Sequence, residues 1–426
     1  MLVWQAGRVT ETDPLPAPEW RRPSLRHRWW AVPLATVGCL LPIIPIVVSF
    51  IPARALVDKS RCAEYQTDKD GKVVFDDAGK AVCSTRVNEA VEYALVPASA
   101  EPVAPLLTIT GADTYDSSGQ IYFVTIVEPA ISVLDWWVTK DDPAARLMSH
   151  RDKYGDRTPQ QLVSAGQQQM RTAKDDAMYV ALQAAGYPVE LQPGDVIIDQ
   201  LVCLEANAAG TECVKSAPAD ELLDPGDKLV KVDGKPVTIV DDLTPILAAV
   251  EPGEKIRIDF VRAGEDMSGE ITTIAAPGED PVRTIIGFMP VDTTTVKLPD
   301  GIDVQIATGG IGGPSAGLAF TLTVLDALTE GDLMGGHKVA VTGTIDLEGN
   351  VGAIGGLNSK ASAVKQMGVE YFLVPVAQGE DGLDGIAQAR KVVGDDVEII
   401  PVSTLQEALD ALRRIGGDPV VVHTTP

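Results

Sequence analysis

The stretch IDVQIATGGIGGPSAGLAFTLTVLDAL, residues 302–328, decides the fold of the last third of the chain. Its first part, IDVQIATG, predicts a strand, and its last part, PSAGLAFTLTVLDAL, predicts a helix. The segment between them is rich in glycine, from Gly309 to Gly313. One serine, Ser315, stands where the predicted helix begins. Its hydroxyl is either a nucleophile or only the cap of a buried helix.

Strands and helices continue to alternate after this stretch. KVAVTGTID, VEYFLVP and VEIIPV predict strands, whereas LNSKASAVKQMG, DGLDGIAQARKVV and STLQEALDALRRIG predict helices. This succession indicates a mixed α/β layer, with helices packed over a sheet, between residues 284 and 417. We expect the chemistry of the protein to lie in this part.

The composition of the whole chain fits a globular protein with more than one domain. At 426 residues, of which 45% are hydrophobic and 5% aromatic, the chain has room for about two or three domains with proper cores. The expected fold class is α+β. The formal net charge of -25 argues against nucleic acid as a partner, because phosphate binding depends on clustered Lys and Arg.

An apolar segment without any charge, residues 29–53, stands near the start of the chain. About 20 apolar residues are enough for a helix to cross a bilayer, so this segment predicts a single transmembrane helix. Each proline in it removes a helix hydrogen bond, which predicts a kink. The prolines are Pro33, Pro42, Pro45 and Pro52.

The charges around the apolar segment favour a cytoplasmic N-terminus. Four arginines precede it and three cations follow it, so the asymmetry is modest. Residues 1–28 would then form a cytoplasmic tail, and the catalytic body would lie outside the cell membrane. A cleaved signal peptide is the alternative, because Ala53-Arg54-Ala55 offers a small-x-small site. The apolar run, however, is far longer than the roughly 7 to 15 residues of a secretory core.

The cysteines agree with an outward-facing body. Cys39 lies in the apolar segment, and the other four are Cys62, Cys83, Cys203 and Cys213. Four cysteines allow three connectivities, and we favour Cys62 with Cys83 and Cys203 with Cys213, because each pair would close one local loop. Metal binding is the weaker alternative, since neither pair has the Cys-x-x-Cys spacing of a zinc knuckle.

Residues 54–189 predict an extracytoplasmic region with strands and helices. Runs such as LLTITG and QIYFVTIV indicate strands, with a turn at residues 111–119 between them. Apolar residues at helical spacing after residue 160 predict one long helix or a helix pair that ends at Gly186.

Residues 190–276 resemble the core of bacterial PDZ domains. The similarity rests on the turn at Pro225-Gly226-Asp227, the strand KLVKVDG and the turn at Asp233-Gly234. PDZ domains bind an extended peptide at an open sheet edge, so the resemblance implies peptide capture, with a carboxylate loop near Pro193 to Val196. The alternative is a small β-domain that serves as a spacer.

A serine hydroxyl needs a base to become a nucleophile. The four histidines offer none in a suitable setting, because His27 precedes the apolar segment, His423 is three residues from the end, and His150 and His337 lie in loop-like stretches. A buried lysine can replace histidine, since burial disfavours the charged amine. Lys360 fits this role, as it opens a predicted helix among small and apolar neighbours.

Three blocks around these residues resemble the proteolytic domain of Lon proteases. They are Gly313-Pro314-Ser315-Ala316-Gly317, then Val341-Thr342-Gly343-Thr344-Ile345, then Ile354-Gly355-Gly356-Leu357 with Lys360, in the order and approximate spacing of that family. The resemblance implies that Ser315 is the nucleophile, Lys360 its general base and Thr342 a hydroxyl that orients the lysine. It also implies an oxyanion site of backbone N–H groups at Gly313, Ser315 and Ala316.

The chain departs from the ATP-dependent members of the family in two places. An acidic residue often precedes Gly-Pro-Ser there, whereas this chain has Gly312, and no Gly-x-x-x-x-Gly-Lys-Ser/Thr phosphate loop occurs in the sequence. The resemblance is thus to membrane-anchored, ATP-independent Lon-like proteases. It implies protein or peptide substrates, no nucleotide, metal or other cofactor, and a possible homo-oligomer.

Two other interpretations of Ser315 remain. Gly313-x-Ser315-x-Gly317 also fits the nucleophile elbow of α/β-hydrolases, but that motif needs a later histidine and leaves the blocks of Thr342 and Lys360 unexplained. Alternatively, Ser315 only caps a helix, and the protein is an inactive, membrane-tethered PDZ adaptor. A lysine in the first turn of a helix is unfavourable without a role, which argues against the adaptor.

Overall fold

The computed structural model describes residues 43–66, 82–154, 159–192, 194–206, 213–276, 283–376 and 385–422. The chain forms two compact units, Met1–Phe50 and Ile51–Pro426. In the first unit the described part is residues 43–50, where α2 (Ile43–Ser49) ends four residues before the predicted membrane helix was expected to end. Most of the predicted membrane segment, residues 29–42, lies outside the described residues. Among those that are described, no helix has both the length and the apolar character needed to cross a bilayer.

A six-stranded sheet forms the centre of the second unit, in the order β24-β23-β20-β5-β3-β6. Strands β5, β20, β23 and β24 run parallel, whereas β3 pairs antiparallel with both β5 and β6. The bounds are β3 (Tyr93–Pro102), β5 (Gln120–Val127), β6 (Arg146–Met148), β20 (Lys338–Val341), β23 (Tyr371–Pro375) and β24 (Glu398–Val402). Half of the sheet therefore comes from residues 93–148, which the sequence had placed in a separate region.

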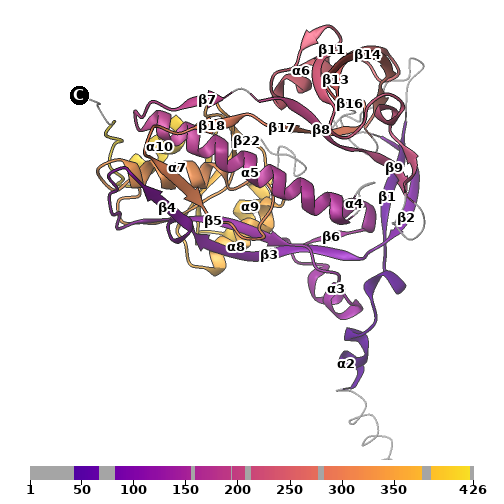
Figure 1. Cartoon of the computed structure of the whole chain (residues 1–426). Helices are drawn as coiled ribbons and strands as arrows, with labels where there is room; N and C mark the ends of the chain where they lie inside the picture. Colours follow the sequence, from indigo (N-terminus) through magenta and orange to yellow (C-terminus); the bar gives the residue numbers. More distant parts are fainter. Residues whose placement is uncertain are drawn as a thin grey trace, which may run out of the picture. The chain divides into compact units, whose positions relative to one another are not determined.

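Helices cover both faces of this sheet, as Figure 1 shows. Because side chains alternate along a strand, Val339 and Val341 point to one core and Ala340 to the other. The first core is closed by α5 (Pro159–Ala184), α7 (Gly317–Leu328) and α10 (Leu405–Arg414), and the second by α8 (Leu357–Gln366) and α9 (Gly385–Val393). The helices and strands expected after residue 302 are confirmed, with a mixed α/β arrangement.

A second six-stranded sheet contains β14-β13-β11-β8-β17, with β12 beside β11. Its strands are β8 (Val196–Leu201), β11 (Lys228–Val232), β12 (Lys235–Pro236), β13 (Lys255–Arg262), β14 (Glu265–Thr272) and β17 (Phe288–Asp292). With η4 (Pro218–Glu221), η5 (Val240–Asp242) and α6 (Leu243–Ala248), these strands enclose a separate apolar core. Two expectations differ here. The sheet extends past residue 276 to β17, and Val196 begins the inner strand β8 rather than lying in a carboxylate loop.

Short pairs of strands complete the unit. They are β1 (Asp58–Tyr65) with β2 (Cys83–Ala90), β4 (Leu107–Thr110) with β19 (Asp303–Ile306), β7 (Glu190–Gln192) with β18 (Thr295–Lys297), β9 (Cys203–Ala206) with β10 (Cys213–Ser216), β15 (Ile274–Ala275) with β16 (Thr284–Ile285), and β21 (Thr344–Ile345) with β22 (Val351–Gly352). The remaining helices are η2 (Ala53–Ala55), η3 (Ala104–Leu106), α3 (Val133–Thr139) and α4 (His150–Tyr154).

A disulfide joins Cys62 of β1 to Cys83 of β2. This is one of the two pairings favoured from the sequence. In the other hairpin, Cys203 lies opposite Ser216 and Cys213 opposite Ala206 along the backbone. The side chains of Cys203 and Cys213 lie outside the described part, so their pairing stays a prediction.

Candidate active site

The loop before α7 presents Ser315 without using it as a helix cap. Ala316 occupies the N-cap position, and no side chain caps the helix there. Gly313 has a φ of 91°, a conformation that residues with a side chain rarely adopt. Gly317 packs so closely on β21 that an added Cβ would lie 3.0 Å from the backbone nitrogen of Ile345. The alternative interpretation, in which Ser315 caps the helix, is therefore wrong, and the Ser315 hydroxyl faces another partner.

That partner is Lys360. Its Nζ lies 2.7 Å from Ser315 Oγ and 3.0 Å from Thr342 Oγ1. Lys360 is 2% exposed and Thr342 is fully buried. Burial of an amine favours its neutral form, which is the form that accepts a proton. The three side chains singled out in the sequence thus meet at one point.

The backbone around Thr342 fixes the nucleophile loop to the end of β20. Thr342 N–H donates to Leu373 O of β23 at 3.0 Å, and Gly343 N–H donates to Ser315 O at 2.9 Å. The Thr342 hydroxyl also donates to Ser315 O, at 3.2 Å. Lys360 comes from the first turn of α8, after the left-handed Gly356 with a φ of 68°. The sheet, α7 and α8 together set the positions of the hydroxyl and the amine.

Helix α5 holds the other side of the same loop. Gly313 N–H donates to Gly166 O at 2.8 Å. Gly312 lies so close to α5 that an added Cβ would be 3.1 Å from the carbonyl carbon of Gly166. Gly166 was not among the site residues predicted from the sequence. Its only signal was a glycine inside a predicted helix, which points to close approach of another backbone.

The backbone amides of the nucleophile loop differ in whether they are free to donate a hydrogen bond to an oxyanion. The Gly313 amide was expected to bind an oxyanion, but it is engaged by Gly166. Within the described part of the chain, the N–H groups of Ser315 and Ala316 have no hydrogen-bond acceptor. Both lie just before α7, where the helix dipole favours negative charge. Of the three amides expected to bind an oxyanion, these two remain available to donate a hydrogen bond.

Residues 290–414 match the family model described as the Lon protease (S16) C-terminal proteolytic domain. This part of the chain is therefore similar to the proteolytic domain of Lon proteases. Ser315, Thr342 and Lys360 all lie within the matched Lon-type residues, as do α7 and α8.

Curated relatives agree over the same region. The Lon protease of Clostridioides difficile (strain 630) is 35% identical over 103 residues, which cover 24% of this chain and 13% of that protein. The Lon protease of Clostridium acetobutylicum is 31% identical over 163 residues, covering 37% of this chain and 20% of that protein. The chain thus matches a fifth or less of the length of these relatives.

Solved structures similar to this chain include the PDZ domain of an SdrC-like protein from Listeria monocytogenes. It is 15% identical, covers 24% of this chain and 93% of that chain, and has a TM-score of 0.19. A second PDZ domain, from an SdrC-like protein of Listeria innocua, has 15% identity, a TM-score of 0.16, and covers 22% of this chain and 93% of that chain. The PDZ character of residues 190–276 stays a prediction.

The Lon-type region is completed by residues outside the family match. Strands β3 and β5 contribute to its sheet, and α5 contributes Met170, Ala173, Ala177, Val180 and Ala181 to the buried interior. The Gly166 contact to the nucleophile loop also comes from α5. One site is therefore built from residues that precede the second sheet in the sequence and from residues that follow it.

The histidine required by an α/β-hydrolase elbow does not meet Ser315 in the described part of the chain. His337 precedes β20, whereas Thr342, which contacts Ser315, follows the opposite end of that strand. His337 instead lies against Tyr371, with its Nδ1 3.9 Å from Glu370 Oε2. His423 lies outside the described residues.

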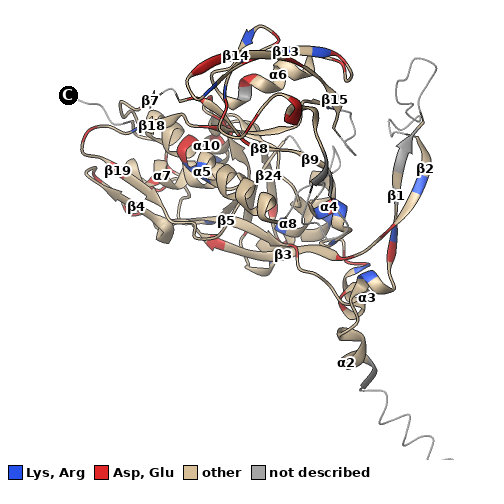
Figure 2. Cartoon of the chain, turned by 45° about the vertical axis from the view of Figure 1, so that its right-hand side comes forward, with Lys and Arg blue, Asp and Glu red and all other residues tan. Residues whose placement is uncertain are grey.

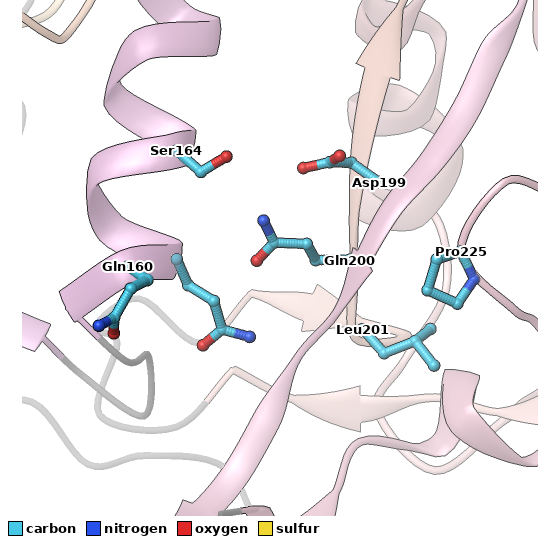
Figure 3. Close-up of a pocket in the computed structure, with 7 residues that line it drawn as sticks. Gln160, Ser164, Asp199, Gln200, Leu201 and Pro225 are labelled. Carbon is cyan, nitrogen blue, oxygen red and sulfur yellow. The ribbon is translucent and has the colours of Figure 1, made fainter. Parts of the chain in front are cut away.

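A hollow of about 520 Å³ lies between α5 and β8. Figure 3 shows Ser164 of α5 and Asp199 of β8 pointing toward one another across it. Its lining residues are Gln160, Gln161, Ser164, Asp199, Gln200, Leu201 and Pro225, so neither Ser315 nor Lys360 contributes. The hollow is therefore separate from the Ser315–Lys360 pair. Its lining residue Ser164 precedes Gly166 on α5 by two residues.

Proposed function

We propose that this chain is a serine peptidase in which Ser315 attacks the peptide bond and Lys360 is the general base. One observation carries the proposal: the amine of a buried lysine lies 2.7 Å from the serine oxygen. The match to the Lon proteolytic domain supports the same assignment. Thr342 positions the lysine through its hydroxyl, 3.0 Å from Nζ.

In the first half of the reaction, Ser315 Oγ forms a bond to the carbonyl carbon while Lys360 Nζ accepts the hydroxyl proton. The carbonyl electrons move onto oxygen, where the amides of Ser315 and Ala316 donate hydrogen bonds. When the intermediate collapses, the C–N bond breaks and the ammonium of Lys360 gives its proton to the leaving amine. The product is an acyl ester on Ser315.

Water completes the reaction by the same route. Lys360 accepts a proton from water as the water oxygen attacks the ester carbon. The second intermediate releases the carboxylic acid product, and the proton returns from Lys360 to Ser315 Oγ. Both residues are then in their initial states.

The substrates that suit such an enzyme are exposed or unfolded protein segments. The sequence contains no phosphate-binding loop of the Gly-x-x-x-x-Gly-Lys-Ser/Thr type, so we propose that cleavage needs no ATP. Segments that are already extended fit a site without an unfolding motor. Addition of ATP should leave the rate of cleavage unchanged.

Peptide capture by the second sheet is a further part of the proposal. Strand β17 stands at one end of that sheet, where an extended peptide could add as a new strand. Its last residue, Asp292, accepts a hydrogen bond from Val240 N–H at the start of η5, at 3.2 Å. A captured peptide would then lie beside a strand that continues into the Lon-type residues.

We also propose that the chain is anchored in the cell membrane, with its catalytic body outside the cytoplasm. The support is the uncharged segment at residues 29–53, together with the Cys62–Cys83 disulfide, which suits an oxidising compartment. Protease added to intact cells should remove the body. A body that survives this treatment contradicts the orientation. Assembly into a homo-oligomer is a related proposal, tested by the mass of the purified particle.

Separate Ser315→Ala and Lys360→Ala variants of the full chain test the peptidase proposal, with cleavage of an unfolded protein as the measurement. Lys365→Ala is the matched control, because Lys365 lies on the same helix and pairs with Asp396 at 2.8 Å. Both dyad variants should lose activity while the control keeps it. Full activity in either dyad variant contradicts the proposal, and cellular function retained by both favours the inactive adaptor.

A further inference from the structure

Two adjacent tryptophans on α3 have opposite environments. Trp136 packs against a small core that contains Ala53, Val57 and Ile131. Trp137 is 66% exposed, and the next residue, Val138, is 64% exposed. Large apolar side chains gathered at one exposed place mark an interaction surface.

The segment that enters the second unit adds a third exposed apolar side chain. Leu56 is 70% exposed and directly follows η2. This segment is tied to α3, because Val133 N–H donates to Ile51 O at 2.9 Å and Pro52 forms a β-bridge with Ser132. We call Leu56, Trp137 and Val138 the α3 patch.

The start of α3 is fixed by its capping box. Asp135 N–H donates to Ser132 Oγ at 3.2 Å, and Ser132 N–H donates to the Asp135 carboxylate at 2.9 Å. With Trp136 packed into the core and Val133 N–H bonded to Ile51 O, the helix cannot turn Trp137 inward without breaking these contacts. Exposure of the patch is thus built into the fold.

The position of the patch in the sequence identifies what covers it. Ile51, which binds α3, is the first residue of the second unit and lies near the end of the uncharged segment, residues 29–53, that we propose as the anchor. A surface held at the exit of a membrane anchor lies at the level of the lipid headgroups. Tryptophan is enriched at that level, because its ring is apolar and its N–H is polar.

We infer that the α3 patch rests in the interfacial layer of the bilayer and fixes the body against the membrane. This inference depends on the proposed anchor. It concerns the orientation of the body and not the chemistry at Ser315.

The charges around the patch indicate an apolar contact rather than an electrostatic one. Figure 2 shows both signs near α3. Arg54 and Lys140 are balanced by Asp141, which pairs with Lys140, and by Asp135 and Asp142. A membrane surface recognised through clustered cations would need an excess of Lys and Arg. Binding of the patch should therefore depend little on anionic lipid.

The test uses the full chain in phosphatidylcholine vesicles, with and without bromine on the acyl chains. The fluorescence spectrum of Trp137→Phe, subtracted from that of the wild type, isolates the emission of Trp137. We expect brominated lipid to remove most of this emission. Emission that is unchanged by bromine overturns the inference. The Trp136→Phe variant supplies the matched control, because Trp136 packs in the protein core and its difference spectrum should be little affected.

Two further measurements separate this inference from the proposed membrane anchor and from the proposed peptidase activity. Carbonate extraction tests the anchor: a chain that resists extraction while Trp137 stays unquenched rejects the patch and keeps the anchor. A chain that is extracted and whose Trp137 stays unquenched rejects both the anchor and the patch. A chain that is extracted but whose Trp137 is quenched supports the patch and rejects the anchor. Cleavage of a short peptide in detergent tests the dyad, and Trp137→Phe should leave it unchanged.

Discussion

The carbonyl oxygen of Gly166 accepts a hydrogen bond from the amide of Gly313, at 2.8 Å. The two glycines belong to different parts of the chain, since α5 precedes the second sheet in the sequence and the nucleophile loop follows it. The same approach leaves little room for a side chain on Gly312. Helix α5 therefore supports the Ser315 loop from outside the region that matches the Lon family.

A methyl group at Gly312 should disturb this contact. In Gly312→Ala the new Cβ would lie 3.1 Å from the carbonyl carbon of Gly166, so we expect the loop and α5 to move apart at this contact. A shift of the nucleophile by a fraction of an ångström to 1 Å should lower kcat by on the order of 10- to 100-fold. Gly310→Ala is the matched control, because a Cβ there meets no atom within 4 Å. Equal rates for the two variants would reject a role for the α5 contact.

Removal of the Thr342 hydroxyl should act through Lys360. In Thr342→Val the lysine loses an acceptor 3.0 Å from Nζ, which disfavours its ammonium form. We expect kcat to fall roughly tenfold, because the lysine is less well oriented, and the acidic limb of the pH profile to move to lower pH. Thr342→Ser should restore both quantities. A purely structural role would lower the rate without moving the profile.

Asp332 should stabilise the fold in a pH-dependent way. Burial alone would raise its pKa, but hydrogen bonds from the hydroxyls of Ser118 and Ser117 and from the Gly119 amide outweigh burial and lower the pKa from 3.8 to about 2. The folded pKa lies below the unfolded one, so the contribution is full above about pH 4 and is lost as the pH falls toward 2.

Urea unfolding of Asp332→Asn measures this contribution. Because the side chain is partly exposed, we expect the variant to lose on the order of 1–2 kcal/mol of unfolding free energy near neutral pH. The difference from the wild type should shrink toward pH 2. A difference that is constant with pH would show that the carboxylate charge is not its source.

His337 should be dispensable for cleavage. It lies at the end of β20 opposite to Thr342 and contacts Tyr371 and Glu370. His337→Gln should therefore keep kcat/KM within about twofold of the wild type, since a solvent-facing substitution away from the site has little effect. Loss of activity with an intact fold would revive the α/β-hydrolase interpretation.

Local sequence patterns predicted much of the Lon-type region. The alternation of strands and helices after residue 302 appears in the structure as β19, α7, β20, α8, β23, α9, β24 and α10. Spacing alone could not place Lys360 beside Ser315, but the family resemblance could, and the two side chains meet. The family resemblance succeeded because the matching sequence blocks contain the nucleophile loop and the starts of α7 and α8. These segments set the distance between Ser315 and Lys360.

Long-range pairings could not be predicted in the same way. Nothing in the periodicity of residues 93–127 says that β5 pairs with β20, because periodicity reports which face is buried and not which strand is adjacent. Strand β17 was missed for the same reason, since its partner β8 lies before the hairpin and helix of the second sheet. The cap at Ala316 depends on a one-residue shift, which is below the resolution of helix signals.

Trapping of the acyl-enzyme tests the central claim most directly. The full chain is mixed with an ester substrate, quenched in acid and measured by intact mass and peptide mapping. We predict one acyl group on Ser315, formed at least about 100-fold more slowly in Lys360→Ala, because general-base catalysis contributes a factor of that order or more. An acyl group on another residue, or equal rates of acylation with and without Lys360, would contradict the Ser315–Lys360 dyad.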